Sequence, residues 1–337
     1  MNKFLKYLLF LLFCLFLGES MARIVSYYMG YGFFADNKRF ISPFFTGTDT
    51  PYPILSKTHG VFVGDHKISY NKEPDEIRLV FIGGSTTKNH SNLENLKYSN
   101  ELNKILNNHF HDNQITCLNA GVDGFSSAHS LVNLSLRIIE FDPDIIVVHH
   151  NTNDHTSSKY GQVLMPDYAN KYLSDHFLGY QHRSGFNGFL LRYFKSARIL
   201  FWGSKSIKSL LQNDSYNYDG VENKELGKKL FQRNLQSMIA ICKQFDIIPI
   251  FLTQPNKRIQ TNFIHREFND LIIQTSEEEN VYVINMAEKI SANDTNFIDD
   301  YHYSGIGILN ISKLLAPYIT AIIERDILNR SKTLSIN

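Results

Sequence analysis

The stretch IRLVFIGGS, from Ile77 to Ser85, decides the fold of this chain. Its first six residues are mostly Ile, Leu, Val and Phe, and two glycines end the run. A short apolar run bounded by glycine predicts a buried β-strand followed by a tight turn. Ser85 comes directly after that turn, so a hydroxyl group is expected at the carboxyl end of the first strand.

Further along the chain, four similar runs alternate with segments whose apolar residues recur at helical spacing. The predicted strands span 115–118, 145–148, 247–253 and 281–285, and the predicted helices span 96–106, 131–139, 226–245, 268–279 and 307–323. Strands separated by helices of this length form a parallel sheet, because each crossover has to return across the sheet. The pattern therefore predicts an α/β fold, a three-layer α/β/α sandwich with a mainly parallel sheet covered on both faces.

The composition is that of a packed globular protein. The 337 residues are 43% hydrophobic, and 34 basic side chains face 33 acidic ones, for a net charge of +1. Disorder and a multi-span membrane architecture do not fit this balance, and nucleic acid has no electrostatic reason to bind. The three cysteines, Cys14, Cys117 and Cys242, are too scattered for a disulfide framework or a zinc motif, and are interpreted as small apolar residues.

The N-terminal segment has the features of an export signal. Lys3 and Lys6 precede an apolar run over 7–18, and small residues follow it. The run is about a dozen residues long, whereas a membrane span needs roughly 20. Two predictions for residues 1–28 therefore stay open, a cleaved signal peptide and an uncleaved membrane anchor, and both place the protein outside the cytoplasm, in the periplasm or at the cell surface. A buried N-terminal helix of a cytosolic protein is the weaker alternative, because a basic start is followed by an unbroken apolar run.

An anchor would have to extend to Tyr28, although Glu19 and Arg23 interrupt the apolar run. The rest of the chain divides into an extended, proline-containing lead-in over 29–75, one α/β domain over 76–325 with an aromatic-rich insertion at about 155–221, and a tail over 326–337.

Residues able to do chemistry follow the predicted strands. They form four blocks: Gly83–Thr87, Asn119–Ser126, His149–Asp154 and Asp299–Ser304. Taken singly, each block reads as turn and capping residues. Ligands of open α/β sheets bind beyond the carboxyl ends of the strands, and all four blocks are expected at that edge. Their common location predicts a functional site.

These blocks resemble those of the SGNH hydrolases, the GDSL-type esterase and lipase superfamily. Ser85 matches the family's nucleophile, Gly124 and Asn153 match the glycine and asparagine of its second and third blocks, and Asp299 and His302 match its Asp-x-x-His pair. The resemblance covers about 77–323, apart from most of the insertion. It implies a flavodoxin-like sheet and a serine hydrolase that uses neither a cofactor nor a metal.

Two positions depart from the family's pattern. Gly84 stands where an aspartate is common, and Asn151 stands where the third block has glycine. The aspartate is not part of the catalytic set, so its replacement is tolerated. Asp300 offers a second carboxylate, but it lies two residues from His302 and is interpreted as a solvent-facing neighbour.

The residue types agree with the chemistry of ester cleavage. A serine hydroxyl is a poor nucleophile until a base accepts its proton, and His302 is the predicted base. Asp299, three residues away, would orient the imidazole. An oxyanion needs preorganised donors. The predicted oxyanion hole consists of the backbone N–H groups of Ser85 and Gly124 and the side-chain amide of Asn153.

Other readings of the same blocks are weaker. A metal site built from His149, His150, Asp154 and His155 is disfavoured, because neighbouring strand residues point to opposite faces. The turn at Ser85 lacks the glycine spacing of phosphate-binding loops. Thr87 occupies the last glycine position of the Gly-x-Ser-x-Gly pattern of α/β-hydrolases.

The expected substrate is an O-acyl ester, O-acetyl by preference, on a glycan. This expectation combines export, the family's common activities and the aromatic insertion, whose rings suit sugars. The insertion also interleaves basic and apolar residues over 189–211, which is typical of a membrane-surface helix, and its aromatics equally suit a core of its own. A lipid esterase or lysophospholipase, an O-acyltransferase and a non-catalytic glycan-binding protein therefore remain alternatives.

Overall fold

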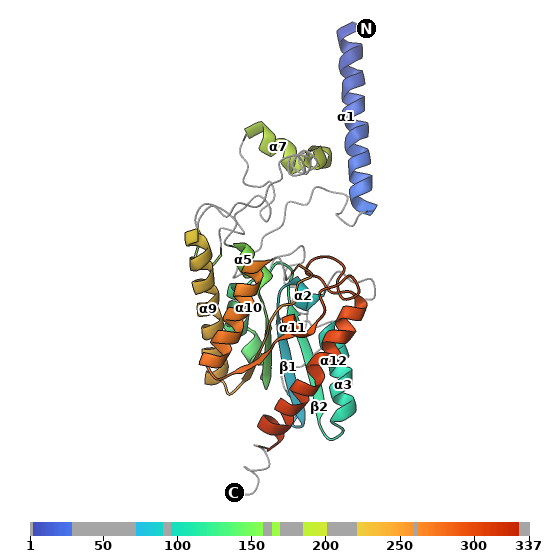
Figure 1. The fold of residues 1–337 in the computed structure, drawn as a ribbon. Coiled ribbons are helices and arrows are strands. Elements are labelled where there is room, and N and C mark those ends of the chain that lie inside the picture. The colour runs from blue at the N-terminus through green and yellow to red at the C-terminus, as the bar shows by residue number, and fades with distance from the viewer. Residues whose placement is uncertain are drawn as a thin grey trace.

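The computed structural model describes residues 3–28, 72–89, 96–157, 164–168, 185–200, 221–258 and 262–329. Its centre is a parallel sheet of five strands in the order β2-β1-β3-β4-β5 (Figure 1). The strands are β1 (Glu76–Gly83), β2 (Gln114–Gly121), β3 (Ile145–His149), β4 (Ile248–Leu252) and β5 (Tyr282–Ile284). This is the predicted flavodoxin-like order, in which the direction of winding reverses between β1 and β3.

Helices cover both faces of the sheet, which confirms the three-layer prediction (Figure 1). One layer contains α3 (Tyr98–His109) and α12 (Gly305–Ile322), and the other contains α4 (Ser127–Leu136), α9 (Val221–Gln244) and α10 (Phe263–Glu278). Alternate side chains of β1 point to opposite faces of the sheet, and so toward different helix layers. Leu79 and Phe81 pack with the α3–α12 core, whereas Val80 and Ile82 pack with the opposite core.

The strand register brings the carboxyl ends of the strands to one level. Gly83, the last residue of β1, pairs with Gly121 of β2 and with His149 of β3. Leu252 and Ile284, the last residues of β4 and β5, also pair with each other. The residue blocks that follow the strands therefore meet at one edge of the sheet.

The charged residue in the first strand is accommodated by hydrogen bonds. Arg78 is fully buried, with its guanidinium 2.8 Å from the Glu76 carboxylate and 2.6 Å from the carbonyl oxygen of Phe141. Phe141 belongs to a short 3-10 turn, η1 (Ile138–Phe141), which follows α4. The sequence predicted one helix over 131–139, but α4 begins earlier and ends at Leu136, and this turn takes its place.

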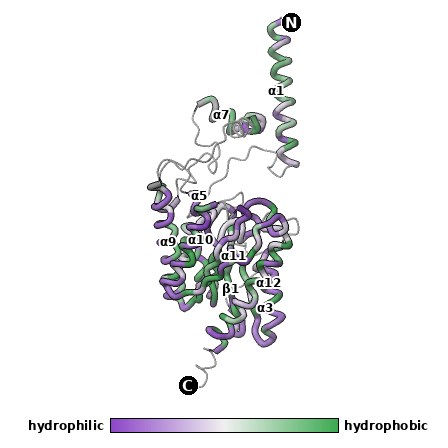
Figure 2. Tube along the Cα trace, viewed as in Figure 1, coloured by the Kyte–Doolittle hydropathy of each residue, from purple (hydrophilic) through white to green (hydrophobic). Residues whose placement is uncertain are grey.

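A long apolar helix, α1 (Lys3–Tyr28), stands apart from the sandwich (Figures 1 and 2). Its most apolar 18-residue window has a mean hydropathy of 2.0, and only 11% of that window is buried. The stretch Gly305–Leu328, which contains α12, is also long and apolar enough to cross a membrane, but half of it is buried against the core. The lead-in up to residue 71, most of the 155–221 insertion and the tail from residue 330 lie outside the described residues.

Candidate active site

The turn after β1 is crowded, which explains its two glycines. A Cβ atom on Gly83 would lie 2.6 Å from the carbonyl oxygen of His149, so no larger residue fits. The amides of Thr87 and Lys88 donate to the Gly84 carbonyl at 3.1 and 3.0 Å and start the short helix α2 (Ser85–Lys88). Ser85 is thereby held at the first position of α2, at the carboxyl edge of the sheet.

Ser85, His302 and Asp299 form a continuous chain of hydrogen-bonded side chains. Ser85 Oγ lies 2.9 Å from His302 Nε2, although the two residues are 217 positions apart in the sequence. On the other side of the ring, His302 Nδ1 lies 2.7 Å from Asp299 Oδ2. One ring nitrogen thus contacts the hydroxyl and the other contacts the carboxylate, which is the arrangement of a nucleophile, a base and an orienting acid.

The Asp299 carboxylate is held in place by the backbone as well. Its Oδ1 accepts hydrogen bonds from the amides of Tyr301 and His302, at 2.8 and 2.7 Å. Burial alone would raise the pKa of Asp299, but these amides and the His302 ring hold that pKa below its ordinary value. The carboxylate is therefore ionised at neutral pH, as stabilisation of an imidazolium requires.

Asn153 lies next to the nucleophile turn. It belongs to the short helix α5 (Thr152–Ser157), and its Nδ2 donates to the carbonyl oxygen of Phe125 at 2.8 Å. That bond fixes the direction of the amide. Gly124 directly precedes Phe125 and has a φ of 76°, a conformation that favours glycine.

A pocket of about 160 Å³ lies over this constellation. Its lining includes Ser85, Asn153 and His302 together with Gly84, Thr86, His149, His150, Asn151, Thr152, Gln254 and Tyr301. Gly124 is not among the lining residues, but it directly precedes Phe125, whose carbonyl oxygen accepts the hydrogen bond from Asn153. The structure thus brings four of the five predicted site residues into one place and sets the fifth beside it.

Asn151, which replaces a glycine of the family's pattern, has a packing role. Its side chain is buried, and its Nδ2 donates to the carbonyl oxygen of His265 and to Asn269 Oδ1, both at 2.8 Å. Both acceptors belong to α10. The asparagine therefore ties the loop that carries Asn153 to the neighbouring helix.

Gln254 is a site residue that the sequence analysis missed. It follows β4 by two positions, and its side chain accepts from the Thr152 amide at 2.8 Å and donates to Thr86 Oγ1 at 3.0 Å. It thus joins α2, which carries Ser85, to α5, which carries Asn153. The signal was available, because Gln254 stands at the carboxyl end of a predicted strand, the same criterion that singled out the four blocks.

The buried His149 ring contacts three hydroxyl groups next to the pocket. Its Nδ1 lies 3.3 Å from Thr87 Oγ1 and its Nε2 lies 3.4 Å from the Tyr303 hydroxyl, with the Tyr98 hydroxyl also 3.4 Å from Nδ1. Burial, with a smaller contribution from the charge of His265, lowers the pKa of His149 to about 3. The ring is neutral at neutral pH and links the α2 turn to the residue after His302.

His150 points to the opposite layer, as expected for consecutive strand residues. Its Nε2 lies 2.7 Å from Ser130 Oγ, and its Nδ1 lies 3.8 Å from the buried carboxylate of Asp154. Asp154 in turn accepts from the Ser127 amide at 3.0 Å, which joins α5 to the start of α4. Within the described ranges, no three His, Cys, Asp or Glu side chains come together as a metal site requires.

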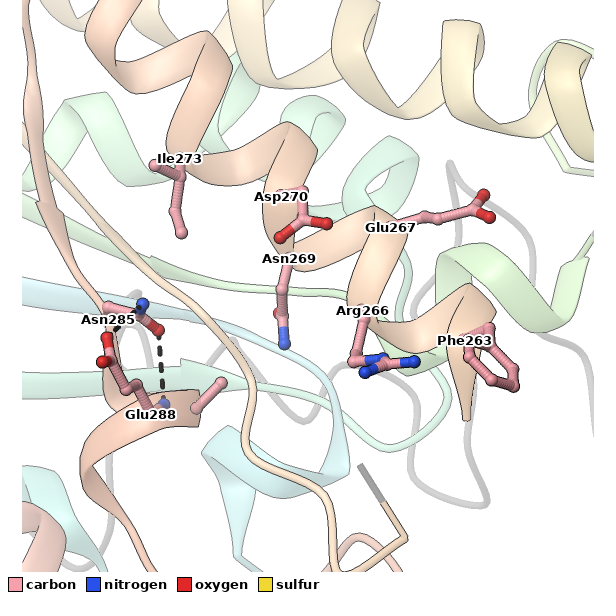
Figure 3. A pocket seen from close by; sticks show the side chains of 9 residues that line it. Phe263, Arg266, Glu267, Asn269, Asp270, Ile273, Asn285 and Glu288 are labelled. Atoms are coloured by element: carbon pink, nitrogen blue, oxygen red, sulfur yellow. Dashed lines mark hydrogen bonds between the residues drawn. The ribbon is translucent and has the colours of Figure 1, made fainter. Parts of the chain in front are cut away.

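A larger hollow, of about 530 Å³, lies between α10 and the short helix α11 (Met286–Lys289). Figure 3 shows its lining residues, which are Phe263, Arg266, Glu267, Asn269, Asp270, Ile273, Asn285, Ala287 and Glu288. The lining contains neither a serine nor a histidine, so this hollow holds no nucleophile and base pair. The smaller pocket is therefore the candidate active site.

No protein-family model matches the chain, and no curated protein has a significant similarity to it. Solved structures do show similar folds. A GDSL-like lipase from Bacteroides thetaiotaomicron is 14% identical, with a TM-score of 0.40, over 72% of this chain and 88% of that one. An acetylxylan esterase from Geobacillus stearothermophilus is also 14% identical, with a TM-score of 0.45, over 71% and 92% of the two chains.

A lipase/acylhydrolase from Enterococcus faecalis is 15% identical, with a TM-score of 0.44, over 73% of this chain and 96% of that one. Identities and TM-scores at this level do not transfer an activity from one protein to another. The function of this chain has to be inferred from the geometry of its own site.

Proposed function

We propose that this protein is a serine esterase of the SGNH type, which cleaves O-acyl esters through an acyl-serine intermediate. One observation carries the proposal: Ser85 Oγ lies 2.9 Å from His302 Nε2, and His302 Nδ1 lies 2.7 Å from Asp299 Oδ2. A hydroxyl group, a base and an acid in this order constitute an activated nucleophile. Their position beyond the carboxyl ends of the strands is where such sheets bind ligands.

The reaction follows from these contacts. Ser85 Oγ attacks the ester carbonyl carbon while its proton passes to His302 Nε2. When the tetrahedral intermediate collapses, the bond to the alcohol oxygen breaks, and the proton on His302 goes to that oxygen. Water then attacks the acyl-serine with His302 again as the base, which releases the carboxylic acid and restores the Ser85 hydroxyl.

The oxyanion hole is assigned to the backbone N–H groups of Ser85 and Gly124 and to the Asn153 side-chain amide. The bond from Asn153 to Phe125 supports this assignment, because it holds the amide beside the turn that carries Ser85. Donors fixed in advance cost no reorganisation when the negative charge develops. Asp299 keeps the imidazole oriented and stabilises the imidazolium that forms in each half of the reaction.

The proposed substrate is an O-acetyl ester on a glycan outside the cytoplasm. A pocket of about 160 Å³ supports a short acyl group, since sites for larger ligands span roughly 300–1,000 Å³. The exposed, apolar helix α1 supports export or tethering to a membrane. A glycan as the alcohol component is the expectation drawn from the family resemblance and from the aromatic insertion.

Reaction of the purified protein with a fluorophosphonate probe and with p-nitrophenyl acetate tests the proposal. Ser85→Ala should abolish labelling, and Ser85→Ala and His302→Ala should each lower kcat by about 10⁴-fold or more, because the two residues act as a unit. Ser237→Ala on α9 and His109→Ala on α3 are matched controls that should retain full turnover. Retention of more than a tenth of the turnover in either site variant would refute the assignment.

The choice of substrate is tested by comparing acyl groups and acceptors. Acetyl esters and O-acetylated oligosaccharides should be cleaved faster than long-chain esters and lysophospholipids. The reverse order would favour the lipid esterase. Transfer of the acetyl group to a sugar in preference to water would favour the acyltransferase, and glycan binding without labelling or turnover would favour the binding protein.

A further inference from the structure

The N-terminal helix α1 is joined to a segment of the insertion that lies far from it in the sequence. The Glu19 carboxylate accepts hydrogen bonds from the backbone amides of Lys195 and Ser196, both at 2.9 Å, and from Ser196 Oγ at 2.7 Å. Residues 195–200 are helical, so Glu19 caps the start of that helical stretch across a separation of 176 positions.

Arg23 strengthens the same contact. Its Nε lies 2.8 Å from Glu19 Oε1, and another guanidinium nitrogen donates to the carbonyl oxygen of Tyr193 at 3.0 Å. Ala22 and Ser26 are the buried residues of α1, and they share one helical face with Glu19 and Arg23. The two charges that interrupt the apolar run are therefore paired with each other and with the insertion.

From Tyr7 onward, the remaining surface of α1 is mainly apolar. The exposed residues on either side of Glu19 include Phe10, Phe13, Phe16, Met21, Ile24, Val25 and Tyr27. The rise from Lys3 to Arg23 is about 30 Å, which matches the hydrocarbon core of a bilayer and places Glu19 about 6 Å inside the edge of that core on the Arg23 side. Since the insertion covers most of Glu19 and Arg23, the described side chains between Tyr7 and Met21 offer a mainly apolar surface to lipid.

The insertion segment over 185–200 has an exposed apolar surface of its own. It contains α7 (Gly185–Tyr193) and lies beside the half of α1 that ends at Tyr28 (Figure 1). Phe186 is 73% exposed and Leu200 is 74% exposed, and the other exposed apolar residues here are Phe189, Tyr193, Phe194 and Ile199. Aromatic side chains next to a membrane-spanning helix are typical of the headgroup layer of a bilayer.

We propose that α1 is retained in the mature protein as a membrane anchor, and that residues 185–200 lie in the headgroup layer of the same membrane, held there by Glu19. The partner of this surface is the lipid bilayer, because the segment is fixed to the side of a helix that is itself suited to lipid. Cleavage after Gly18 would separate the apolar run from Glu19, and cleavage after Ser20 would remove Glu19 together with that run. The proposal does not depend on the esterase chemistry.

The first experiment determines the N-terminus of the membrane-bound protein. Membranes from cells that produce the full chain are washed with alkaline carbonate, and the intact mass of the retained protein is measured. We expect a chain of 38.9 kDa that resists the wash. A shorter chain that begins after residue 18 or 20, released in soluble form, would overturn the proposal whatever its esterase activity.

The second experiment places a fluorescent probe on the proposed lipid-contacting surface. Trp202 is the single tryptophan, so Trp202→Phe gives a silent background in which Phe189→Trp reports on the insertion and Phe245→Trp, at the end of α9, is the control. In vesicles of brominated phosphatidylcholine, we expect the probe at 189 to lose fluorescence and the probe at 245 to keep it. Equal quenching of the tryptophans at 189 and 245 would overturn the proposal. Concentration-dependent crosslinking at position 189 without quenching would also overturn it, and would favour a second copy of the chain as the partner.

The third experiment tests Glu19 as the holding residue. Glu19→Ala should raise the rate of tryptic cleavage after Lys195 and Arg198 about tenfold, because loss of the cap frees that helical stretch. Met21→Ala is the matched control, since Met21 is 66% exposed on the same helix. An unchanged thermal midpoint of the α/β domain shows that the fold is intact. Identical cleavage rates in Glu19→Ala and the native protein would refute the role of Glu19.

Discussion

The side-chain amide of Asn153 occupies the space next to Gly84 that any larger residue would need. A Cβ atom at position 84 would lie 2.5 Å from Asn153 Nδ2 and 3.1 Å from the carbonyl oxygen of Phe125, which accepts the hydrogen bond of that amide. The φ of Gly84 is −88°, a value open to every residue. Glycine is therefore required at this position for close approach and not for backbone conformation.

Gly84→Ala should consequently displace the Asn153 amide and lower kcat on p-nitrophenyl acetate by about tenfold or more, while Ser85 remains reactive toward a fluorophosphonate. Gly84→Asp, which introduces a larger side chain at the same position, should be at least as harmful. Gly18→Ala, at a glycine with open space around it, is the control and should leave turnover unchanged. Full activity in Gly84→Ala would show that the amide can move without cost.

Asn153→Ala separates oxyanion stabilisation from the reactivity of the nucleophile. If the amide binds the developing oxyanion, kcat should fall by about 10² to 10³ with little change in KM, because the bond strengthens only as charge appears. Fluorophosphonate labelling should persist at a lower rate. Asn151→Ala should behave in the opposite way, mainly lowering the unfolding midpoint, since it removes two buried hydrogen bonds to α10. A lower unfolding midpoint with unchanged kcat in Asn153→Ala would mean that Asn153 stabilises the turn and does not bind the oxyanion.

The two neighbouring carboxylates should respond differently to the same substitution. Asp299 contacts His302 Nδ1, whereas Asp300 pairs with Arg258 at 2.9 Å. Asp299→Asn should lower kcat by about 10² to 10⁴, because the amide no longer stabilises the imidazolium or fixes its tautomer. Asp300→Asn should change kcat by no more than about threefold, in line with the small energies of exposed ion pairs. Equal losses in the two variants would mean that the loop, and not the carboxylate, is what matters.

The buried histidines should make the fold sensitive to mild acid. Burial lowers the pKa of His149 to about 3 and that of His265 to about 4, whereas a histidine in the unfolded chain titrates near 6.5. Below pH 6.5 the unfolded state therefore binds more protons than the folded state. The contribution of these histidines to the free energy of unfolding is fully present above pH 6.5 and is lost as the pH falls toward the pKa values of the folded state. Each such histidine should lower the free energy of unfolding by about 1.4 kcal/mol per pH unit.

Urea denaturation between pH 6.5 and 5, where carboxylates contribute little, measures this slope. His149→Gln should reduce it by about one proton. The same slope in the native protein and in His149→Gln would mean that His149 is already protonated in the fold or is not buried from solvent.

The strands were predictable because they follow from local patterns, whereas the pairing of Ser85 with His302 was expected from the resemblance of the four blocks to those of the SGNH hydrolases. An apolar run ended by glycine identifies a strand wherever it lies, and the parallel arrangement then places the following residues at one edge. The end of α4 was not predictable, since apolar residues continue at helical spacing into η1. The contacts of His149 with Thr87, Tyr98 and Tyr303 were equally hidden, because these residues come from three different elements and no short spacing connects them.

The separation of Ser85 from His302 has a consequence for the timing of reactivity. A chain is synthesised from its N-terminus, so the proposed nucleophile leaves the ribosome 217 residues ahead of its base. Until the loop after β5 has been made and has docked at the sheet edge, Ser85 carries an ordinary alcohol group. The proposed nucleophile would thus stay unreactive during synthesis of the chain, and would be activated only when the last part of the domain folds.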